Sequence, residues 1–345
     1  MAPVIREADR RKVKFFILHT GQHYDYLMDK VFFKNLSVPQ PKYNLRVGSG
    51  AHGATTGKML QGIEAILTRE KPSAVFVQGD TNSVLAGTLA AAKLNIPVAH
   101  IEAGLRSYDR TMPEELNRIV ADHLSDYLFA PTEETAKLAK SEGISKKKIF
   151  VTGNTIVDAV RILTPDLKAI FKKYGVRKNG YHLLTMHRPA NVDNPKTLRE
   201  LLAGIAAISD RMGLPCLFPA HPRTIANISA ARIKVPGSIR ILPPADYGDL
   251  LGLERGAAMV FTDSGGIQEE SCVLGKKCLI LRTNTERPET LKTGGAVLLK
   301  SLTAKSVISA FRMLEKRKIR WQNPFGDGHA AERIVRTMIA ANKPS

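Results

Sequence analysis

Short apolar runs alternate along this chain with longer segments in which apolar residues recur every three to four positions. The long segments have the period of amphipathic helices, and the clearest are residues 83–94, 114–124, 197–211 and 304–315. Strands that alternate with helices in this way predict parallel β-sheets covered on both faces. The predicted strands are 14–19, 74–77, 98–101, 127–129 and 149–151, followed by 181–185, 216–218, 239–242, 259–262, 278–281 and 296–299.

The two series of strands are separated by residues 163–180, a charged segment that contains Pro165, Gly175 and Gly180. We interpret this segment as a helix and a linker. A chain of 345 residues is long enough for two domains, each with its own core. The pattern therefore predicts an α/β protein with one parallel sheet in each domain.

The composition excludes several classes of protein. The chain is 43% hydrophobic and 24% charged, as in a globular protein. No apolar run approaches the roughly 18 residues of a membrane span, and residues 1–12 lack the apolar core of a signal peptide. The three cysteines, Cys216, Cys272 and Cys278, have no metal-ligand spacing. We expect a cytoplasmic protein with no metal and no membrane partner.

The net charge of +19 favours phosphorylated substrates or polyanions. The basic residues are scattered, however, and aromatic residues make up only 6% of the chain. A nucleic-acid-binding protein usually gathers its basic residues on one face, with aromatic residues among them. We therefore expect no nucleic-acid partner.

Five predicted strands end directly in polar residues, at the edge where open α/β sheets bind their ligands. Each single residue could instead be a loop charge or a helix cap. Five such strand ends together indicate one shared active site. The residues are Asp80, Glu102, His187, His221 and Asp263, each of which follows a different predicted strand.

Residues 264–266, Ser-Gly-Gly, lie between a predicted strand and a helix that begins near Ile267. Free N–H groups and the helix dipole at such a turn favour a diphosphate. The alternative is an ordinary N-cap formed by Asp263 or Ser264. Glu269 and Glu270, in the following turn, could accept hydrogen bonds from ribose hydroxyls.

Glu114 and Arg118 are four residues apart on a predicted helix that begins near Pro113, so they share one face. One interpretation is a surface ion pair. The other is a part in the active site, because the helix follows directly from the loop of Glu102. Carboxylates, a histidine and arginines together suit proton transfer beside a phosphorylated leaving group.

Taken together, these residues resemble the non-hydrolysing UDP-N-acetylglucosamine 2-epimerases over nearly the whole chain. The long run at 100–118 and the pair at 263–270 and 285–289 are specific in combination. The matching stretches are TGQHYD at 20–25, GDTNSVLAG at 79–87, HIEAGLRSYDRTMPEELNR at 100–118, VTGNTIVDA at 151–159, MHRPANVDN at 186–194, DSGGIQEE at 263–270 and TERPE at 285–289.

The resemblance implies two Rossmann-like domains with a cleft between them, as in glycosyltransferase-B-like folds. The expected divisions are 1–160 for the domain with the catalytic carboxylates, 161–325 for the UDP-binding domain, and 326–345 for a C-terminal helix that packs back on the first domain. The implied reaction interconverts UDP-N-acetylglucosamine and UDP-N-acetylmannosamine through elimination and re-addition of UDP. No cofactor is expected. A homodimer and a place in cell-surface polysaccharide biosynthesis are expected.

The resemblance also assigns residues by motif. Asp80, Glu102 and Glu114 match the catalytic carboxylates of the family, Arg118 a catalytic arginine and His187 a catalytic histidine near the diphosphate. Which carboxylate is the base and which the acid stays open. The residues that match UDP-binding positions are His221, Ser264, Gly265, Gly266, Glu270 and Arg287.

Two departures from the family pattern are evident. The family begins with a strand and a Gly-Thr-Arg-Pro-Glu turn, whereas Met1 lies in the helix that follows, so we expect an N-terminal truncation and a missing first strand. Thr56 stands where relatives often carry Gln, which leaves regulation by a second UDP-N-acetylglucosamine open. The alternative functions are an epimerase for a related UDP-2-acetamido sugar, a hydrolytic epimerase, a glycosyltransferase of the same fold, or an inactive nucleotide-sugar-binding protein.

Overall fold

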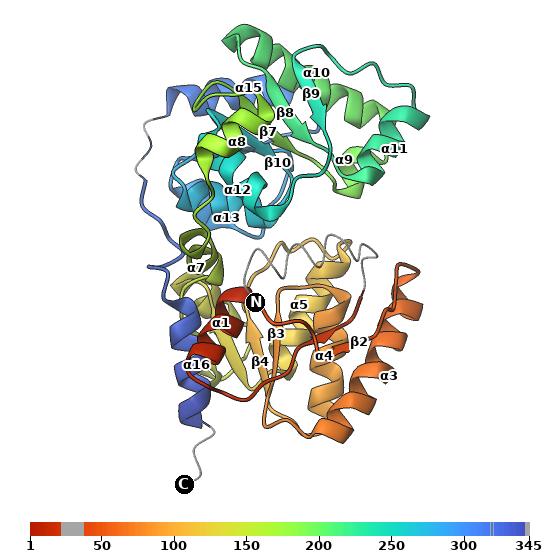
Figure 1. The fold of residues 1–345 in the computed structure, drawn as a ribbon, viewed down its shortest axis with the longest axis vertical. Helices are drawn as coiled ribbons and strands as arrows, with labels where there is room; N and C mark the ends of the chain where they lie inside the picture. Colours follow the sequence, from red (N-terminus) through yellow and green to blue (C-terminus); the bar gives the residue numbers. More distant parts are fainter. Residues whose placement is uncertain (22–37, 318, 320, 342–345) are drawn as a thin grey trace. The chain divides into compact units, whose positions relative to one another are not determined.

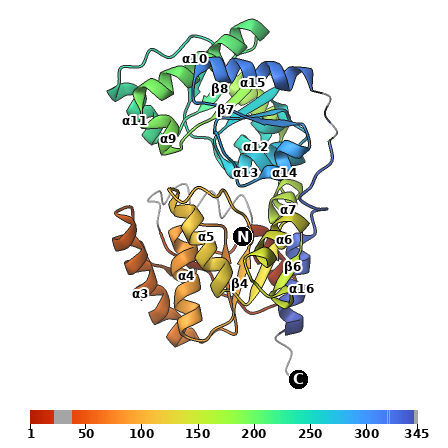
Figure 2. The ribbon, with the colours of Figure 1, turned by 180° about the vertical axis from the view of Figure 1, so that it is seen from behind.

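The structure, a computed structural model, describes residues 1–21, 38–317, 319 and 321–341. The chain divides into two compact units (Figures 1 and 2). Unit 1 contains Met1–Ile162 and Phe325–Ser345, and unit 2 contains Leu163–Pro324. Every strand pairing in the described residues is parallel, and each unit is Rossmann-like. The α/β class predicted from the sequence pattern is therefore confirmed.

The described part of unit 1 contains a four-stranded sheet in the order β3-β4-β5-β6 and a separate pair, β1-β2. Within the described residues no strand pairing joins the two sheets. The strands are β1 (Leu18–His19), β2 (Tyr43–Asn44), β3 (Val75–Gln78), β4 (Val98–Ile101), β5 (Tyr127–Ala130) and β6 (Ile149–Val151).

The first predicted strand, 14–19, is wrong in its extent. Only Leu18 and His19 form strand β1, because the ladder to β2 starts with the hydrogen bond from the Tyr43 N–H to the Ile17 carbonyl. Strand β2 was not predicted, since two residues are too few to show a period of two.

The helices of unit 1 cover both faces of its four-stranded sheet. Val77 and Val98 pack with Met59 of α3 and Val84 of α4, whereas Ile101 packs with Val4 of α1 and Ile334 of α16. The opposite faces follow from the period-2 alternation of side chains along a strand. The helices are α1 (Ala2–Arg10), α3 (His52–Glu70), α4 (Asn82–Lys93), α5 (Pro113–Leu124), α6 (Glu133–Ser141), α7 (Thr155–Ile162) and α16 (Ala330–Ala341), with a 3₁₀ turn at Lys146–Lys148.

Unit 2 contains a six-stranded parallel sheet in the order β12-β11-β10-β7-β8-β9. The bounds of all six strands lie within one residue of the prediction. The chain order reverses between β7 and β10, so the carboxyl ends of these two strands flank the switch point where such sheets bind ligands. The strands are β7 (His182–Thr185), β8 (Cys216–Pro219), β9 (Ile239–Leu242), β10 (Met259–Thr262), β11 (Cys278–Ile280) and β12 (Ala296–Leu298).

Helices cover both faces of this sheet as well, and α10 and α15 pack together on one of them. Gly204 makes their close approach possible, since a Cβ there would lie 2.7 Å from the Cβ of Val307. No helix in the described part of the chain is long and apolar enough to span a bilayer. The helices are α8 (Leu167–Tyr174), α9 (Pro189–Val192), α10 (Pro195–Met212), α11 (Pro222–Ala230), α12 (Tyr247–Gly256), α13 (Gly265–Val273), α14 (Pro288–Lys292) and α15 (Ala304–Lys316).

Candidate active site

Arg118 of α5 is the centre of a buried group of charges in unit 1. Its side chain is 2% exposed, and its Nη2 lies 2.6 Å from Asp80 Oδ2. Its Nη1 lies 2.5 Å from Glu115 Oε2. The neighbouring Asn117 donates from Nδ2 to the Asp80 carbonyl at 2.9 Å. Helix α5 therefore holds Asp80, which follows β3, through both its side chain and its backbone.

The interpretation of Glu114 and Arg118 as a surface ion pair is wrong. Arg118 is buried and pairs with Glu115, three residues before it, rather than with Glu114. Glu115 also accepts hydrogen bonds from the backbone N–H groups of Ser107 and Tyr108, both at 2.9 Å. It thus ties the 107–108 loop to α5, while Glu114 stays half-buried at the first turn of the helix.

The guanidinium of Arg118 keeps a donor for a ligand at Nε. Its Nε is buried and forms no hydrogen bond within the described residues. A buried donor without a partner is costly in a folded protein. A substrate oxygen beside Arg118 would relieve that cost, which is consistent with a binding role for this side chain.

Glu102 follows β4, one strand away from Asp80, and its backbone is in the left-handed region with φ of +67°. Non-glycine residues adopt this conformation rarely, and such residues concentrate at functional sites. Gln78, the last residue of β3, donates from Nε2 to Glu102 Oε1 at 2.5 Å. The same Nε2 lies 3.1 Å from Thr155 Oγ1. The carboxylate of Glu102 is therefore oriented from the neighbouring strand.

Gln78 is a candidate site residue that sequence reasoning missed. Its signal was its position, because it lies at the end of β3, in register with Ile101 and one residue before Gly79. The structure brings Asp80, Glu102 and Arg118 to the carboxyl ends of β3 and β4, with Glu114 one turn before Arg118 on α5.

In unit 2, Asp263 holds the loop that carries His187. Its side chain is fully buried at the end of β10. Its carboxylate lies 3.2 Å from His187 Nδ1 and accepts the backbone N–H groups of His187 at 3.0 Å and Arg188 at 2.9 Å. Asn191 Nδ2 donates to it at 3.0 Å. Asp263 therefore orients the half-exposed imidazole and is not the cap of α13.

Electrostatics in this pair favour an ionised carboxylate. Burial by itself would raise the pKa of Asp263. The hydrogen bond from His187, the charge of that imidazole and the N–H groups of Arg188 and His187 lower the pKa below its ordinary value. A carboxylate bonded to Nδ1 directs the other ring nitrogen, Nε2, toward its own partner, as in catalytic histidines.

The first turn of α13 combines an uncapped N-terminus with two glycines. Ser264 is the N-cap residue but its side chain caps no backbone N–H. A Cβ at Gly265 would lie 2.9 Å from Glu286 Oε1, whereas a Cβ at Gly266 would meet nothing within 4 Å. Gly265 is therefore needed for packing against residues 286–287. Gly266 faces open space beside a helix terminus that favours anions.

Arg287 belongs to a cluster in which three arginines meet at Glu286. Its Nε lies 3.1 Å from Glu269 Oε1 and its Nη1 lies 2.9 Å from Glu286 Oε1. Glu286 also pairs with Arg282 at 2.8 Å and lies 3.6 Å from Arg188. Burial would raise the pKa of Glu286, but Arg287 and Arg282 hold it well below its ordinary value. Three arginines thus converge on one carboxylate, an arrangement that favours a nearby bound anion.

Glu270 is buried and accepts a hydrogen bond from the Tyr247 hydroxyl at 2.6 Å. Beside it, the fully buried Glu254 accepts from Ser271 Oγ at 2.6 Å. Burial raises the pKa of both carboxyls, and the charge of Glu270 raises the pKa of Glu254 well above its ordinary value of 4.5. We infer that Glu254 is the protonated member of this pair.

The substitution Glu254→Gln is expected to change how stability depends on pH. The protonated Glu254 contributes stability that is fully present below pH 4.5 and is lost as the pH rises through its raised pKa. Gln keeps an oxygen for Ser271 and has no proton to lose. The variant should therefore not lose this stability as the pH rises, and above the raised pKa of Glu254 it should be more stable than wild type. Urea unfolding at several pH values measures the difference. Parallel pH curves for wild type and variant would contradict this prediction, and Glu133→Gln on the exposed start of α6 is the control.

His221 is placed differently from the other predicted site residues. It is exposed at the end of β8 and is the N-cap of α11, where its Nδ1 accepts the backbone N–H of Arg223 at 3.2 Å. Its other ring nitrogen is not used in that cap. A capping role and a substrate contact are compatible for this residue.

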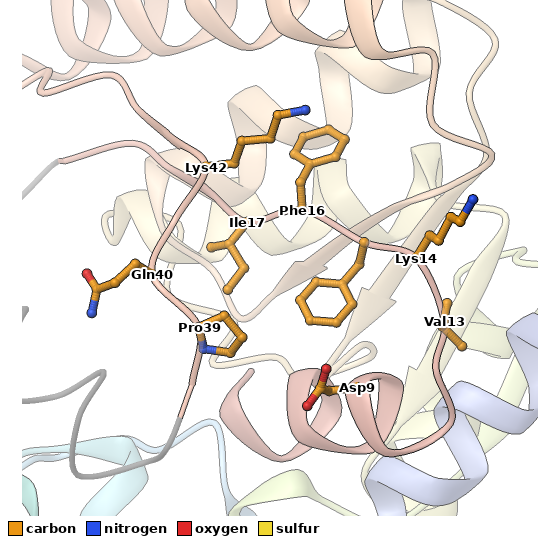
Figure 3. Close-up of a pocket in the computed structure, with 9 residues that line it drawn as sticks. Asp9, Val13, Lys14, Phe16, Ile17, Pro39, Gln40 and Lys42 are labelled. Atoms are coloured by element: carbon orange, nitrogen blue, oxygen red, sulfur yellow. The ribbon is translucent and has the colours of Figure 1, made fainter.

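A hollow of about 330 Å³ lies beside α1 in unit 1, between Asp9 and the segment before β1 (Figure 3). Phe16, Ile17 and Pro39 line it, and Lys42 Nζ lies 5.6 Å from the ring centre of Phe16. None of the predicted site residues lines this hollow. In the described residues, no three His, Cys, Asp or Glu side chains are grouped as a metal ion would require.

Comparisons with known proteins agree with one another. Residues 6–339 match the family model of UDP-N-acetylglucosamine 2-epimerase. A relative of that name from Methanocaldococcus jannaschii is 47% identical over an alignment of 350 positions, which covers 98% of this chain and 94% of the relative. A crystal structure of the M. jannaschii UDP-GlcNAc 2-epimerase with UDP-GlcNAc and UDP has a TM-score of 0.92 at 46% identity, over 98% of this chain and 95% of that one. A UDP-2,3-diacetamido-2,3-dideoxy-D-glucuronate 2-epimerase from Pseudomonas aeruginosa is 38% identical over 97% of this chain and 94% of its own length.

Proposed function

This chain belongs to the UDP-N-acetylglucosamine 2-epimerase family, and on that premise we propose that it interconverts UDP-N-acetylglucosamine and UDP-N-acetylmannosamine by inverting C2 of the sugar. The observation that carries the proposal is the group at the ends of β3 and β4, where Asp80 pairs with the buried Arg118 and Glu102 is oriented by Gln78. Proton transfer at an unactivated carbon needs such positioned carboxylates.

The reaction consists of an elimination and its reverse on the other face. A carboxylate removes the C2 proton while the C1–O bond breaks, the electron pair forms a C1–C2 double bond, and UDP leaves with the oxygen. UDP then adds back to C1 while C2 takes a proton on the opposite face. Asp80, Glu102 and Glu114 are the candidates for these two transfers. The guanidinium of Arg118 would stabilise the charge that develops as the C1–O bond breaks.

Unit 2 supplies the proposed UDP site. The N–H groups of α13 at Gly265 and Gly266, together with the arginines gathered at Glu286, suit the diphosphate. His187, oriented by Asp263, is a donor for the departing phosphate oxygen. Ser264 and Glu270 are the proposed partners of the remaining phosphate and ribose oxygens, and His221 is a further UDP contact.

The test is incubation with UDP-N-acetylglucosamine in deuterated water, followed by mass spectrometry and NMR of the product. The proposal expects UDP-N-acetylmannosamine that carries deuterium at C2. Transfer of the sugar without deuterium would indicate a glycosyltransferase, and free N-acetylmannosamine would indicate a hydrolytic enzyme. UDP binding without any exchange at C2 would indicate an inactive binding protein.

A second candidate substrate is a UDP-2,3-diacetamido sugar acid, because the P. aeruginosa epimerase for such a substrate is 38% identical to this chain. The higher identity of 47% to a UDP-N-acetylglucosamine 2-epimerase favours the first substrate. The ratio of kcat/KM for the two UDP-sugars decides between them. A higher value for the sugar acid would overturn the assignment of the substrate and leave the C2 chemistry intact.

Replacement of Gly266 by Ala is expected to weaken UDP binding without harming the fold. A Cβ at this position meets no protein atom, so it would lie in the space proposed for the diphosphate. We expect a loss of affinity of about 10-fold or more, since the backbone can no longer approach the anion. Calorimetric titration with UDP measures this loss.

Gly265→Ala is the matched comparison for Gly266→Ala. Its Cβ would meet Glu286 Oε1 at 2.9 Å, so this variant should lose about 1–3 kcal/mol of stability through overpacking. If Gly266→Ala binds UDP as tightly as wild type does, the diphosphate lies elsewhere.

The protein is also proposed to act as a homodimer. Leu116, Val120 and Leu124 recur at i, i+4 spacing on α5, and their side chains are 43%, 38% and 37% exposed. An apolar stripe of this kind is typical of a surface that another protein covers. Sedimentation analysis should give twice the chain mass of 37.8 kDa, and a monomer at micromolar concentration would contradict the proposal.

A cytoplasmic location and a part in cell-surface polysaccharide biosynthesis complete the proposal. All three cysteines are free and buried, which is consistent with a reducing compartment. Localisation of the tagged protein by cell fractionation tests the first point, and loss of N-acetylmannosamine from surface polysaccharide in a deletion strain tests the second.

A further inference from the structure

His100, the third residue of β4, forms two hydrogen bonds that require both of its ring nitrogens to donate. Its Nδ1 lies 2.7 Å from Asp122 Oδ1 and its Nε2 lies 2.9 Å from the Gly79 carbonyl oxygen. A carbonyl oxygen and an ionised carboxylate can only accept. Both nitrogens therefore carry protons, and His100 is an imidazolium ion with no exposed surface.

The charge of His100 is balanced by an alternating chain of ions. Asp122 of α5 is fully buried, and its Oδ2 lies 2.7 Å from Arg106 Nη1. Arg106 also donates to Glu142 from Nε at 2.9 Å and from Nη2 at 2.5 Å. Two cations and two carboxylates leave no net charge. A buried ion is tolerated when it is paired and hydrogen-bonded in this way.

The ion pair holds the two loops that follow β3 and β4. His100 bonds to Gly79, the residue before Asp80, and Asp122 accepts the backbone N–H of Gly104 at 3.1 Å, two residues after Glu102. Gly79 and Gly104 have φ of +81° and +80°, conformations that favour glycine. At Gly104 no other residue would fit, because a Cβ would meet the Thr135 carbonyl.

Helix α5 connects this pair to the proposed catalytic groups. Glu114, Arg118 and Asp122 follow one another at spacing of four, so they share one face of α5. Arg118 holds the Asp80 side chain. His100 and Asp122, which pair with each other, hold the backbone at Gly79, before Asp80, and at Gly104, after Glu102. One helix face thus reaches both loops.

We propose that His100 and Asp122 are a positioning pair for the proposed epimerisation, which fixes the distance between the carboxylates of Asp80 and Glu102. The inference rests on the function proposed above. The protein itself uses both ring nitrogens of His100 and both carboxylate oxygens of Asp122, so the two side chains act through the Gly79 and Gly104 backbones and not on the substrate. A displacement of about 1 Å in a catalytic group can cost about 100-fold in rate.

The protonation of His100 makes the pair sensitive to alkaline pH. Burial by itself would lower the pKa of His100, but the hydrogen bond and charge of Asp122, the Gly79 carbonyl and the charge of Glu102 raise it above 6.5. The imidazolium is therefore present below pH 6.5 and is lost as the pH rises through the raised pKa. The Met1 amino group, near Glu102, has a pKa that burial lowers to about 6, so it titrates before this step.

The variant that tests the proposal is His100→Gln, which can keep one donor but has no charge. We expect kcat to fall about 10- to 100-fold, while KM and the affinity for UDP stay within about threefold. Wild type should show an alkaline fall of kcat, and the variant should lack it. A purely structural role would not move that part of the pH profile.

His182→Gln is the matched control. His182 is a buried histidine of β7 in unit 2, with Nδ1 3.2 Å from Ser209 Oγ and a pKa that burial lowers to about 4, so it is neutral. This control should keep kcat within about twofold. A His100→Gln enzyme with kcat within twofold of wild type, or with the same alkaline fall, overturns the proposal.

A measurement on the wild-type protein keeps the test decisive if His100→Gln does not fold. In protein labelled with ¹⁵N-histidine, one of the nine histidines should keep two protonated ring nitrogens above pH 6.5, as seen by NMR. The absence of any such histidine overturns the proposal. Wild-type protein that shows this signal but incorporates no deuterium at C2 would refute the proposed function and leave the ion pair established.

Discussion

Glu102→Gln is expected to lower kcat for C2 epimerisation by about 10²- to 10⁴-fold, the range lost when a general acid–base group is removed. Gln has the same length and keeps an oxygen that can accept the hydrogen bond from Gln78 Nε2. It cannot take up a proton, however. Deuterium incorporation at C2 and formation of the epimer should therefore fall together.

The binding of UDP separates a chemical defect from a structural one. Calorimetric titration should show the same UDP affinity for Glu102→Gln as for wild type, because the proposed UDP contacts belong to unit 2. Glu133→Gln, on the exposed first turn of α6, should leave both properties unchanged. A Glu102→Gln enzyme that retains more than a tenth of the wild-type kcat would remove Glu102 from the proton transfers.

The adjacent glutamates at the start of α5 are expected to separate stability from activity. Glu115→Ala should lower the free energy of unfolding by about 3–5 kcal/mol, because it leaves the buried Arg118 without one of its two carboxylates. The N–H groups of Ser107 and Tyr108 lose their acceptor as well. Glu114→Ala should change the free energy of unfolding by no more than about 0.5 kcal/mol, since within the described residues its side chain belongs to no such network.

Activity should depend on Glu114, although stability does not. The Glu114→Ala protein should fold normally and lose about 100-fold or more in kcat if this carboxylate transfers a proton, as the resemblance implies. Circular dichroism during urea unfolding measures the stability of the whole chain. The single tryptophan, Trp321, lies over Gly275 and Gly295, so its fluorescence reports unit 2 and should be unaffected by either substitution. Equal stability of the two variants would contradict the assignment of Glu115 to the buried network.

The two candidate sites, around Arg118 and around Arg287, differ in the arrangement of their buried charges. Around Arg118 two carboxylates, Asp80 after β3 and Glu115 of α5, share a single guanidinium, and its Nε has no partner within the described residues. Around Arg287 three arginines converge on the single carboxylate of Glu286. The first arrangement suits a group that shifts charge during a proton transfer, and the second suits a permanent anion such as a diphosphate.

The sequence by itself determined the α/β class, the six strands of unit 2 to within one residue, and the family. Parallel strands buried on both faces are nearly continuous apolar runs, and turn residues mark their ends, so the sequence alone predicts them. The sequence also predicts the candidate residues, because ligand-binding residues of such sheets follow directly after the strands. The motifs at 100–118 and 263–270 carried the assignment to the family.

Only the tertiary structure decided what each polar residue contacts. Glu114 and Glu115 both lie within helical reach of Arg118, at spacings of four and three, so spacing does not distinguish the buried partner from its neighbour. Asp263 has the position of a helix cap, yet its carboxylate accepts a hydrogen bond from the backbone N–H of His187. The two residues meet because β7 and β10 are paired, with Thr185 opposite Thr262, which is 77 residues later in the chain. The charge of His100 depends on two acceptors from other segments. Contacts between residues distant along the chain leave no periodic signal in it, and for that reason the sequence pattern predicts elements better than it predicts partners.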